Sequence, residues 1–188
     1  MLKHVQEFGK YIAIAGFRTQ RIENVEAFLE KAKNAAAENC EIQFFDAGLV
    51  ASWQHLYFAV LNALKAFKNG ENISKNLAME MLLYASAQRQ IHKAMNMLGI
   101  KQNTCEVAVV VVGENRNGVE STLDNVLRVV DGKRDDKVLK LTPEKIAKVR
   151  RVFEISDAEI EAVADGKTLE EAITDLVIER VALLATER

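Results

Sequence analysis

Few residue types that could perform chemistry occur in this sequence, and their spacing does not match a catalytic site. Gly113 and Gly118 form a G-x-x-x-x-G pattern after an apolar run, where a phosphate-binding P-loop would lie. The Lys and the Ser or Thr that complete such a loop are absent, because Val119 and Glu120 follow Gly118. Without the lysine that reaches the phosphates and the hydroxyl that binds Mg²⁺, the pattern does not predict nucleotide binding.

Metal binding and nucleophilic catalysis find equally little support. His4, His55 and His92 lie far apart, and no two of them share the i, i+4 spacing of a helical metal-binding pair. Ser86 precedes His92 by six residues, but no G-x-S-x-G elbow surrounds it. A helix-capping serine is the simpler interpretation. We therefore expect no catalytic residues, no metal site and no cofactor.

Length and composition are those of an ordinary globular chain of 188 residues, with 49% hydrophobic and 28% charged residues. We expect a single domain over 1–188, consisting of an α/β core over 1–132 and a helical C-terminal segment over 133–188. Cys40 and Cys105 have neither metal-ligand nor C-x-x-C spacing, which predicts reduced thiols and a cytoplasmic protein. The longest apolar runs are too short to span a bilayer, so we expect no membrane partner.

The net charge of −2 hides an asymmetry along the chain. Residues 51–112 carry six cations and three acids, a balance of +3. Residues 138–188 carry eight cations and eleven acids, a balance of −3. A polyanion would therefore be attracted to the middle of the chain rather than to its end.

The hydrophobic pattern predicts an alternation of strands and helices followed by a helical tail. Predicted strands are 10–18, 41–46, 79–85 and 104–112, and helices are predicted over 21–38, 53–68 and 119–130. Thr142, Ser156 and Thr168 are predicted N-caps of three tail helices. We expect a mixed α/β (α+β) fold, with a small central sheet of about four strands covered by helices and a C-terminal helical tail.

The stretch 79–98 is the most informative. Its apolar first half predicts a buried strand that turns near Ser86 into a helix, with one apolar stripe formed by Ile91, Ala94, Met95 and Leu98. This places Arg89 and Gln90 in the first helical turn, where backbone N–H groups lack intrahelical partners. The guanidinium of Arg89 suits a phosphate or a carboxylate. On spacing alone, a solvated helix start explains these residues equally well.

The helix predicted over 53–68 is apolar on two sides, which is typical of a helix that is buried between layers or faces a partner. Its second side consists of small residues in line with His55, namely Ala59, Ala63 and Ala66. His55 has two interpretations: a hydrogen-bonded or solvated residue beside the helix start, or part of a polar contact surface with Arg89 and Gln90.

Two long segments, 46–67 and 72–100, resemble a known family. They are similar to the kinase-binding regulatory subunits of the KEOPS complex, the family of the PRPK-binding protein TPRKB, in its archaeal type. The residues that carry the resemblance are Asp46, His55, Ala59, Ala63, Glu80, Arg89, Gln90, Ile91 and Gly99, together with the tail segment 178–184. Ala87 departs from the pattern, because many members are expected to have Gly there.

The resemblance implies a protein that is not an enzyme. It would bind and stimulate the small atypical kinase/ATPase of KEOPS and would help to recruit tRNA, including its 3′ CCA end, for threonylcarbamoyladenosine modification. The implied kinase contacts are Tyr84, Ile91 and Met95, together with the small-residue side of helix 53–68. The implied tRNA contacts are Arg89, Gln90, His55, Lys75 and Lys93.

Two other functions remain open from the sequence. One is a small-ligand enzyme with its site at the strand-to-helix junction near residues 86–92. The other is a homo-oligomeric scaffold that associates through an apolar helix face.

Overall fold

The valine-rich run in the middle of the chain forms a central strand of an antiparallel sheet. In a computed structural model, which describes residues 1–186, this strand is β4 (Glu106–Gly113). The five-stranded sheet has the order β1-β2-β4-β3, and β5 pairs with β2. The other strands are β1 (Leu2–Val5), β2 (Lys10–Arg18), β3 (Glu41–Asp46) and β5 (Lys133–Arg134).

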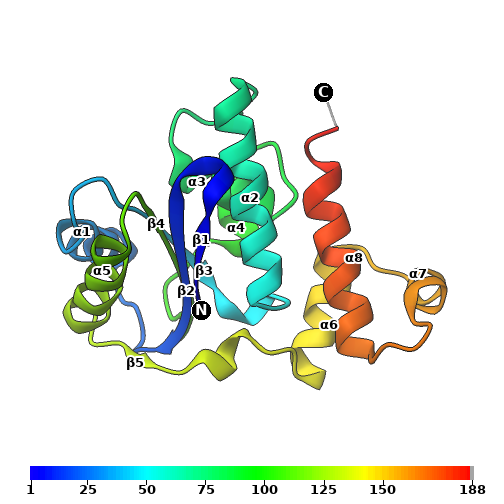
Figure 1. Cartoon of the computed structure of the whole chain (residues 1–188). Coiled ribbons are helices and arrows are strands. Elements are labelled where there is room, and N and C mark those ends of the chain that lie inside the picture. Colours follow the sequence, from blue (N-terminus) through cyan, green and yellow to red (C-terminus); the bar gives the residue numbers. More distant parts are fainter. Residues whose placement is uncertain (187–188) are drawn as a thin grey trace. The chain divides into compact units, whose positions relative to one another are not determined.

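The chain divides into two compact units, each assembled from two separate segments (Figure 1). The first unit comprises Met1–Ala47 and Gly99–Val138, and the second comprises Gly48–Leu98 and Leu139–Arg188. One short 3-10 helix, η1 (Gln6–Phe8), joins β1 to β2. Two others, η2 (Ala47–Leu49) and η3 (Asp136–Leu139), lie where the chain passes from the first unit to the second.

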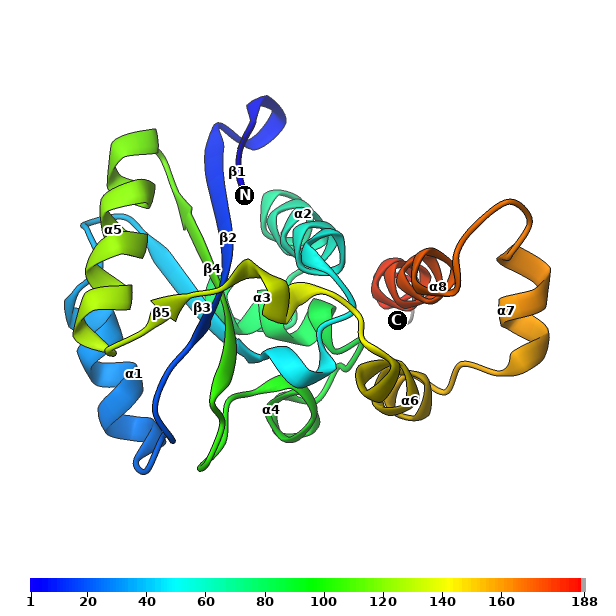
Figure 2. The same cartoon turned by 90° about the horizontal axis from the view of Figure 1, so that it is seen from below.

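In the first unit, α1 (Val25–Asn34) and α5 (Arg116–Val129) lie over the same face of the sheet (Figure 2). Side chains alternate between the faces of a strand, so every second residue of β2 and β4 points toward these helices. The register pairs Ala15 with Val109 and Phe17 with Val107, which aligns the two apolar rows. The resulting core includes Ala13, Ala15, Phe17, Phe28, Phe44, Val107, Val109, Val111, Leu123 and Val126.

The two glycines of the incomplete P-loop pattern have a structural explanation. The side-chain oxygen of Asn115, the N-cap of α5, accepts a hydrogen bond from the N–H of Gly118 at 2.6 Å. A Cβ at Gly113 would lie 2.8 Å from both Cys40 Sγ and Val119 Cγ2. Gly113 therefore permits close packing, and at Gly118 a Cβ would lie 2.9 Å from the capping oxygen of Asn115.

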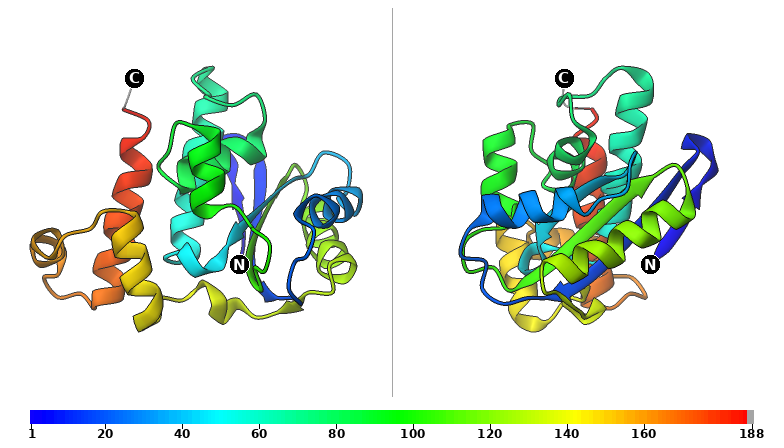
Figure 3. Two further views of the ribbon diagram at one scale, coloured as in Figure 1. Left: turned by 180° about the vertical axis from the view of Figure 1, so that it is seen from behind. Right: turned by 90° about the vertical axis from the view of Figure 1, so that its left-hand side faces the viewer.

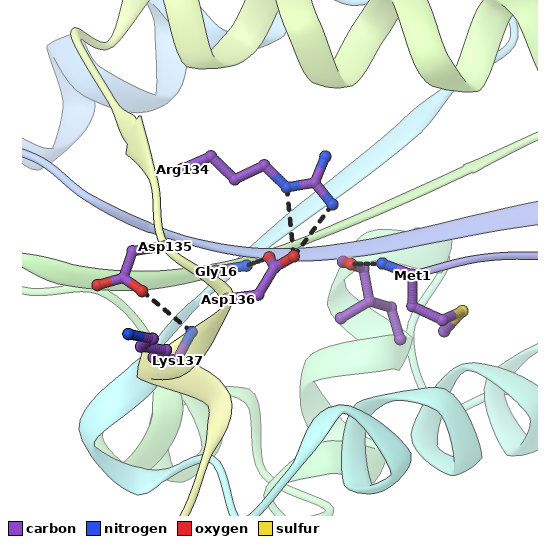
Figure 4. Close-up of polar contacts among 7 residues, drawn as sticks. Met1, Gly16, Arg134, Asp135, Asp136 and Lys137 are labelled. Atoms are coloured by element: carbon purple, nitrogen blue, oxygen red, sulfur yellow. Dashed lines mark hydrogen bonds and ion pairs between the residues drawn. The ribbon is translucent and has the colours of Figure 1, made fainter.

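Polar contacts fasten the chain around β5 to β2 (Figure 4). One carboxylate oxygen of Asp136 accepts from the N–H of Gly16 at 2.9 Å, and the other accepts from Arg134 at 3.1 Å. The carbonyl of Ile14, also on β2, accepts from the amino group of Met1 at 2.8 Å. The strands that pair with the outer side of β2, β1 and β5, are very short and were not predicted from the sequence.

The second unit is helical. Its helices are α2 (Trp53–Asn69), α3 (Leu77–Ala85), α4 (Ile91–Leu98), α6 (Pro143–Val152), α7 (Asp157–Val163) and α8 (Leu169–Leu183). Helix α2 packs against both α3 and α8, and α6 and α7 also contact α8 (Figure 3). The predicted caps of the tail are confirmed: Thr142 caps α6, and Ser156 and Thr168 each form a complete capping box.

The mixed α/β class, the small sheet and the helical tail are confirmed, but the prediction of a strand over 79–85 is wrong. These residues belong to α3, which begins after the N-cap Asn76. A short apolar run without periodicity is compatible with a buried strand or a buried helix. The run is rich in Leu, Met and Ala, which favour helices, and it lacks β-branched residues.

One consequence follows from this correction. The predicted strand-to-helix junction is a corner between two helices, so the premise of the small-ligand enzyme site is also wrong. The segment 72–76, directly before α3, is irregular. Within residues 1–186, no helix is long and apolar enough to cross a membrane.

The corner between α3 and α4, residues 86–90, begins with a Schellman motif. The N–H of Gln88 donates to the carbonyl of Leu83, and the N–H of Ala87 donates to that of Tyr84, both at 3.0 Å. Ala87 therefore occupies the left-handed position, with φ of +50°. The hydroxyl of Ser86 donates to the carbonyl of Leu82 at 2.8 Å, so it closes the helix end.

Replacing Ala87 with glycine should stabilise the protein. A left-handed conformation costs an L-residue roughly 1–2 kcal/mol, whereas glycine loses more chain entropy on folding, so we expect a net gain of about 0.5–1 kcal/mol in the free energy of unfolding. Urea unfolding would measure this change in the free energy of unfolding. The matched control is Ala85→Gly in the right-handed last turn of α3, which should lower the free energy by about 1 kcal/mol or more. A loss of stability in Ala87→Gly would contradict this account of the turn.

Candidate functional site

The Schellman turn brings the two most characteristic polar residues of the predicted site to the surface. Arg89 and Gln90 are both exposed, whereas the α3 residues that precede the turn are buried. The carbonyl of Gln90 accepts from the N–H of Ala94 at 3.0 Å, so Gln90 lies at the start of α4. The turn thus fixes the backbone of both residues at an exposed position of the corner.

A polar pocket of about 220 Å³ lies beside this corner, within the second unit. Its polar side chains come from α2, from the loop after α2, from α3 and from the corner: Asn62, Lys65, Glu71, Tyr84 and Arg89. Ala66, Ile73, Leu184 and Ala185 complete the lining. The sequence offered no signal for Asn62, Lys65 or the end of α8, because only tertiary packing brings these segments to Arg89.

Tyr84 lies in this pocket rather than on an open surface, since its side chain is 4% exposed. Burial raises the pKa of the Tyr84 hydroxyl, and the nearby carboxylates of Glu80 and Glu71 add to this increase, whereas Arg89 opposes it. The hydroxyl therefore remains protonated at neutral pH and can donate a hydrogen bond into the pocket.

His55 is inside the second unit, with both ring nitrogens hydrogen-bonded. Nδ1 accepts from the N–H of Ala51 at 3.3 Å, so the proton resides on Nε2, which donates to the carbonyl of Ala85 at 2.7 Å. Its ring also contacts Phe153 edge-on, with centroids 5.6 Å apart. Burial lowers the pKa of His55 to about 4, and the positive charge of Lys145 acts in the same direction. The uncharged His55 ring thus connects α2 to the end of α3 through a hydrogen bond.

The apolar stripe predicted on α4 divides into two parts. Ala94 and Leu98 are fully buried, whereas Ile91 is 45% and Met95 49% exposed. Ile91 and Met95 are i, i+4 neighbours and therefore form one exposed apolar patch. Lys93 is also exposed, about 200° around the helix axis from Ile91. The apolar patch and Lys93 thus lie on different sides of α4.

The small-residue side of α2 is not available to a partner in this structure. Ala59, Ala63 and Ala66 are all buried, at 1%, 0% and 3% exposed, so the expectation that they form part of an open contact surface is wrong. Their missing side-chain bulk allows the neighbouring helices to approach α2 closely. Lys75, in contrast, is exposed on the loop between α2 and α3.

The structure thus joins some of the predicted residues and separates others. Tyr84 and Arg89 line one pocket, and Lys75 lies on the same loop as the pocket residues Glu71 and Ile73. Ile91 and Met95 form a separate patch. His55 is connected to the residue before the corner through its hydrogen bond to Ala85.

The fold and the site describe a mixed α/β protein with a polar pocket and an exposed helix corner. Comparison with known proteins agrees with this class: the family model described as kinase binding protein CGI-121 matches residues 19–185. The chain belongs to the CGI-121 family. This confirms the resemblance that segments 46–67 and 72–100 carry.

Relatives come from both archaea and fungi. The regulatory protein Cgi121 of Methanocaldococcus jannaschii is 33% identical over 116 residues, which cover 61% of this chain and 71% of the relative. The EKC/KEOPS complex subunit CGI121 of Gibberella zeae is 26% identical over 166 residues, 84% of each chain. The KEOPS complex subunit Cgi121 of Pyrococcus abyssi is 28% identical over 102 residues, 54% of this chain and 53% of the relative.

The buried neutral His55 predicts a loss of stability in mild acid. Its pKa is about 4 in the folded protein and about 6.5 when unfolded, so between these values only the unfolded chain takes up the proton. The free energy of unfolding should therefore fall by about 1.4 kcal/mol per pH unit as the pH decreases from 6.5 to 4, roughly 3 kcal/mol in total.

Urea unfolding across this pH range would test the prediction with the variant His55→Gln, which lacks the titrating ring. The stability difference between the wild type and this variant should shrink as the pH falls. His92→Gln, at an exposed position of α4, keeps His55 and should keep the acid-dependent loss. Parallel stability curves for the wild type and His55→Gln would contradict the role given to His55.

Proposed function

We propose that this protein is a cytoplasmic, non-catalytic accessory subunit of a KEOPS complex. It binds and stimulates the small kinase/ATPase subunit and helps to recruit tRNA through the 3′ CCA end for threonylcarbamoyladenosine modification. Membership of a family described as kinase binding supports the first activity, and the KEOPS subunit names of the relatives support the assembly.

The observation that carries the proposal is the arrangement of the α3–α4 corner. It presents Arg89 and Gln90 beside a polar pocket, and the exposed patch of Ile91 and Met95 follows immediately on α4. Such a corner suits two different partners, because a guanidinium binds phosphate and an apolar patch binds a protein surface.

The pocket supports recognition of a single-stranded RNA end. Its volume of about 220 Å³ is below the range typical of drug-sized ligands, so it suits a group the size of one base or phosphate. Lys65 and Arg89 provide positive charge, and Tyr84 and Asn62 provide hydrogen-bonding groups. Unstacked bases at RNA ends are recognised by such groups, including the flat face of an arginine side chain.

Lys75 and Lys93 would extend this RNA contact along the phosphate backbone, since both are exposed. Direct contact by His55 would require its hydrogen bond to Ala85 to break, so we assign His55 an indirect role. His55 holds the end of α3, directly before the corner that carries Arg89 and Gln90. Tyr84 likewise contributes to the pocket, and the kinase contact is assigned to Ile91 and Met95.

Because the two surfaces are built from different residues, separate substitutions should affect the two partners separately. Arg89→Glu should lower the affinity for an intact tRNA by roughly tenfold or more at moderate salt, since a charge-assisted contact becomes a repulsive one. The double variant Ile91→Glu, Met95→Glu should lose co-purification with the kinase subunit but keep tRNA affinity. Gel shifts and affinity co-purification would measure the two effects.

Two controls complete this experiment. Lys33→Glu makes the same charge change at an exposed position of α1 in the first unit and should leave both partners bound. A tRNA lacking its CCA end should bind the wild type more weakly than intact tRNA. Equal losses in Arg89→Glu and Lys33→Glu, or no effect of the CCA end, would overturn the tRNA part of the proposal. An intact kinase complex with the double variant would overturn the kinase part, and self-association through the patch would instead support a homo-oligomeric scaffold.

A further inference from the structure

We propose that Glu80 is a positioning residue of the RNA-contact surface: its buried carboxylate holds the loop 71–76, which carries Lys75 and part of the pocket wall, in the geometry that RNA binding requires. This inference rests on the proposed function and extends it to a residue that touches neither partner.

Glu80 is fully buried in the first turn of α3. Its Oε1 accepts from the N–H of Ile73 at 3.0 Å, and its Oε2 accepts from the N–H of Ser74 at 2.6 Å. Burying a carboxylate is unfavourable unless it is hydrogen-bonded, and backbone N–H groups inside a protein need acceptors. The two requirements satisfy each other here, so the carboxylate and the loop depend on one another.

The same loop is fixed on both sides of Lys75. The side-chain amide of Asn72 donates to the carbonyl of Ser74 at 2.9 Å, and the N–H of Asn76 donates to the Ser74 hydroxyl at 3.2 Å. Asn76 in turn caps α3 by accepting from the N–H of Met79. The backbone around Lys75 is therefore held by Ser74 and Asn76, and Ser74 is held by Glu80.

Loop position and pocket shape are linked, because Glu71 and Ile73 line the pocket together with Arg89. If the Ile73 and Ser74 amides lose their acceptors, the pocket wall and Lys75 move together. Tyr84, one turn after Glu80 on α3, completes the connection to the pocket. Glu80 thus acts on RNA binding through the loop rather than through contact.

The direction of the change in tRNA affinity distinguishes a positioning role of Glu80 from a simple effect of its negative charge. Glu80 is an acid within a segment that would attract RNA, so removing its charge alone should strengthen RNA binding. Glu80→Gln keeps one acceptor oxygen but directs an NH₂ donor at the second loop N–H, so one loop hydrogen bond is lost. We expect this variant to bind tRNA roughly tenfold more weakly. The control Glu161→Gln removes the same charge from an exposed residue of α7, outside the pocket and the loop, and should bind equally well or more tightly.

A double-mutant cycle with Lys75→Ala tests the route of the effect by fluorescence anisotropy with an unmodified tRNA transcript. If Glu80 acts by positioning Lys75, the loss caused by Glu80→Gln should be clearly smaller in the Lys75→Ala background. Hydrogen exchange at the Ile73 and Ser74 amides should increase in Glu80→Gln, while exchange in α2 and α8 should be unchanged. If Glu80→Gln does not fold, Glu80→Asp keeps both acceptor oxygens one methylene further away and should give a smaller loss of the same sign.

The outcomes distinguish this inference from the proposed function. Absence of tRNA binding by the wild type would overturn both. If the wild type binds tRNA and Lys75→Ala weakens it, wild-type affinity in Glu80→Gln overturns only the role of Glu80. Strictly additive losses, or faster exchange throughout the second unit, would show a general loss of structure and would also overturn it.

Discussion

The hydrogen bond from His55 to the carbonyl of Ala85 is the interaction on which the candidate site depends. It joins the first turn of α2 to the last residue of α3, at 2.7 Å and out of contact with solvent. The Schellman turn begins directly after Ala85, so the position of Arg89 and Gln90 follows from the position of this carbonyl. A neutral imidazole suits this place, because it can accept from the N–H of Ala51 and donate to Ala85 together.

Glu80 has a similar role at the other end of α3, in its first turn. His55 fixes the end of α3 from α2, and Glu80 fixes the loop that enters α3. Buried polar groups stabilise a fold when all their hydrogen bonds are made, and both residues meet this condition. Buried hydrogen bonds therefore hold both the loop before α3 and the end of α3, the two segments from which Ile73 and Arg89 reach the pocket. The exposed Arg89 and Lys75 therefore lie on backbone segments that the buried His55 and Glu80 hold in place.

Predictions from the sequence were correct where interactions within a few residues decide the structure, and wrong where packing between distant segments decides it. Strands β2 and β3 and the caps Thr142, Ser156 and Thr168 were predicted because propensity and capping act over a few residues. Helix α3 was predicted as a strand, because burial on all sides removes the periodicity that distinguishes the two. In the site, Arg89, Gln90, Ile91 and Met95 are exposed, as a contact role requires, whereas His55 and the alanines of α2 are buried.

By itself, the sequence determined the mixed α/β class, the helical tail, the family and the residues that carry the resemblance. Local patterns of apolar and capping residues suffice for the class and the tail. The tertiary structure alone decided which histidine is inside, which face of α4 is exposed, and that Lys65, Glu71 and the end of α8 meet Arg89 around one pocket. These features depend on contacts between segments far apart in the chain, and no spacing within one segment encodes them.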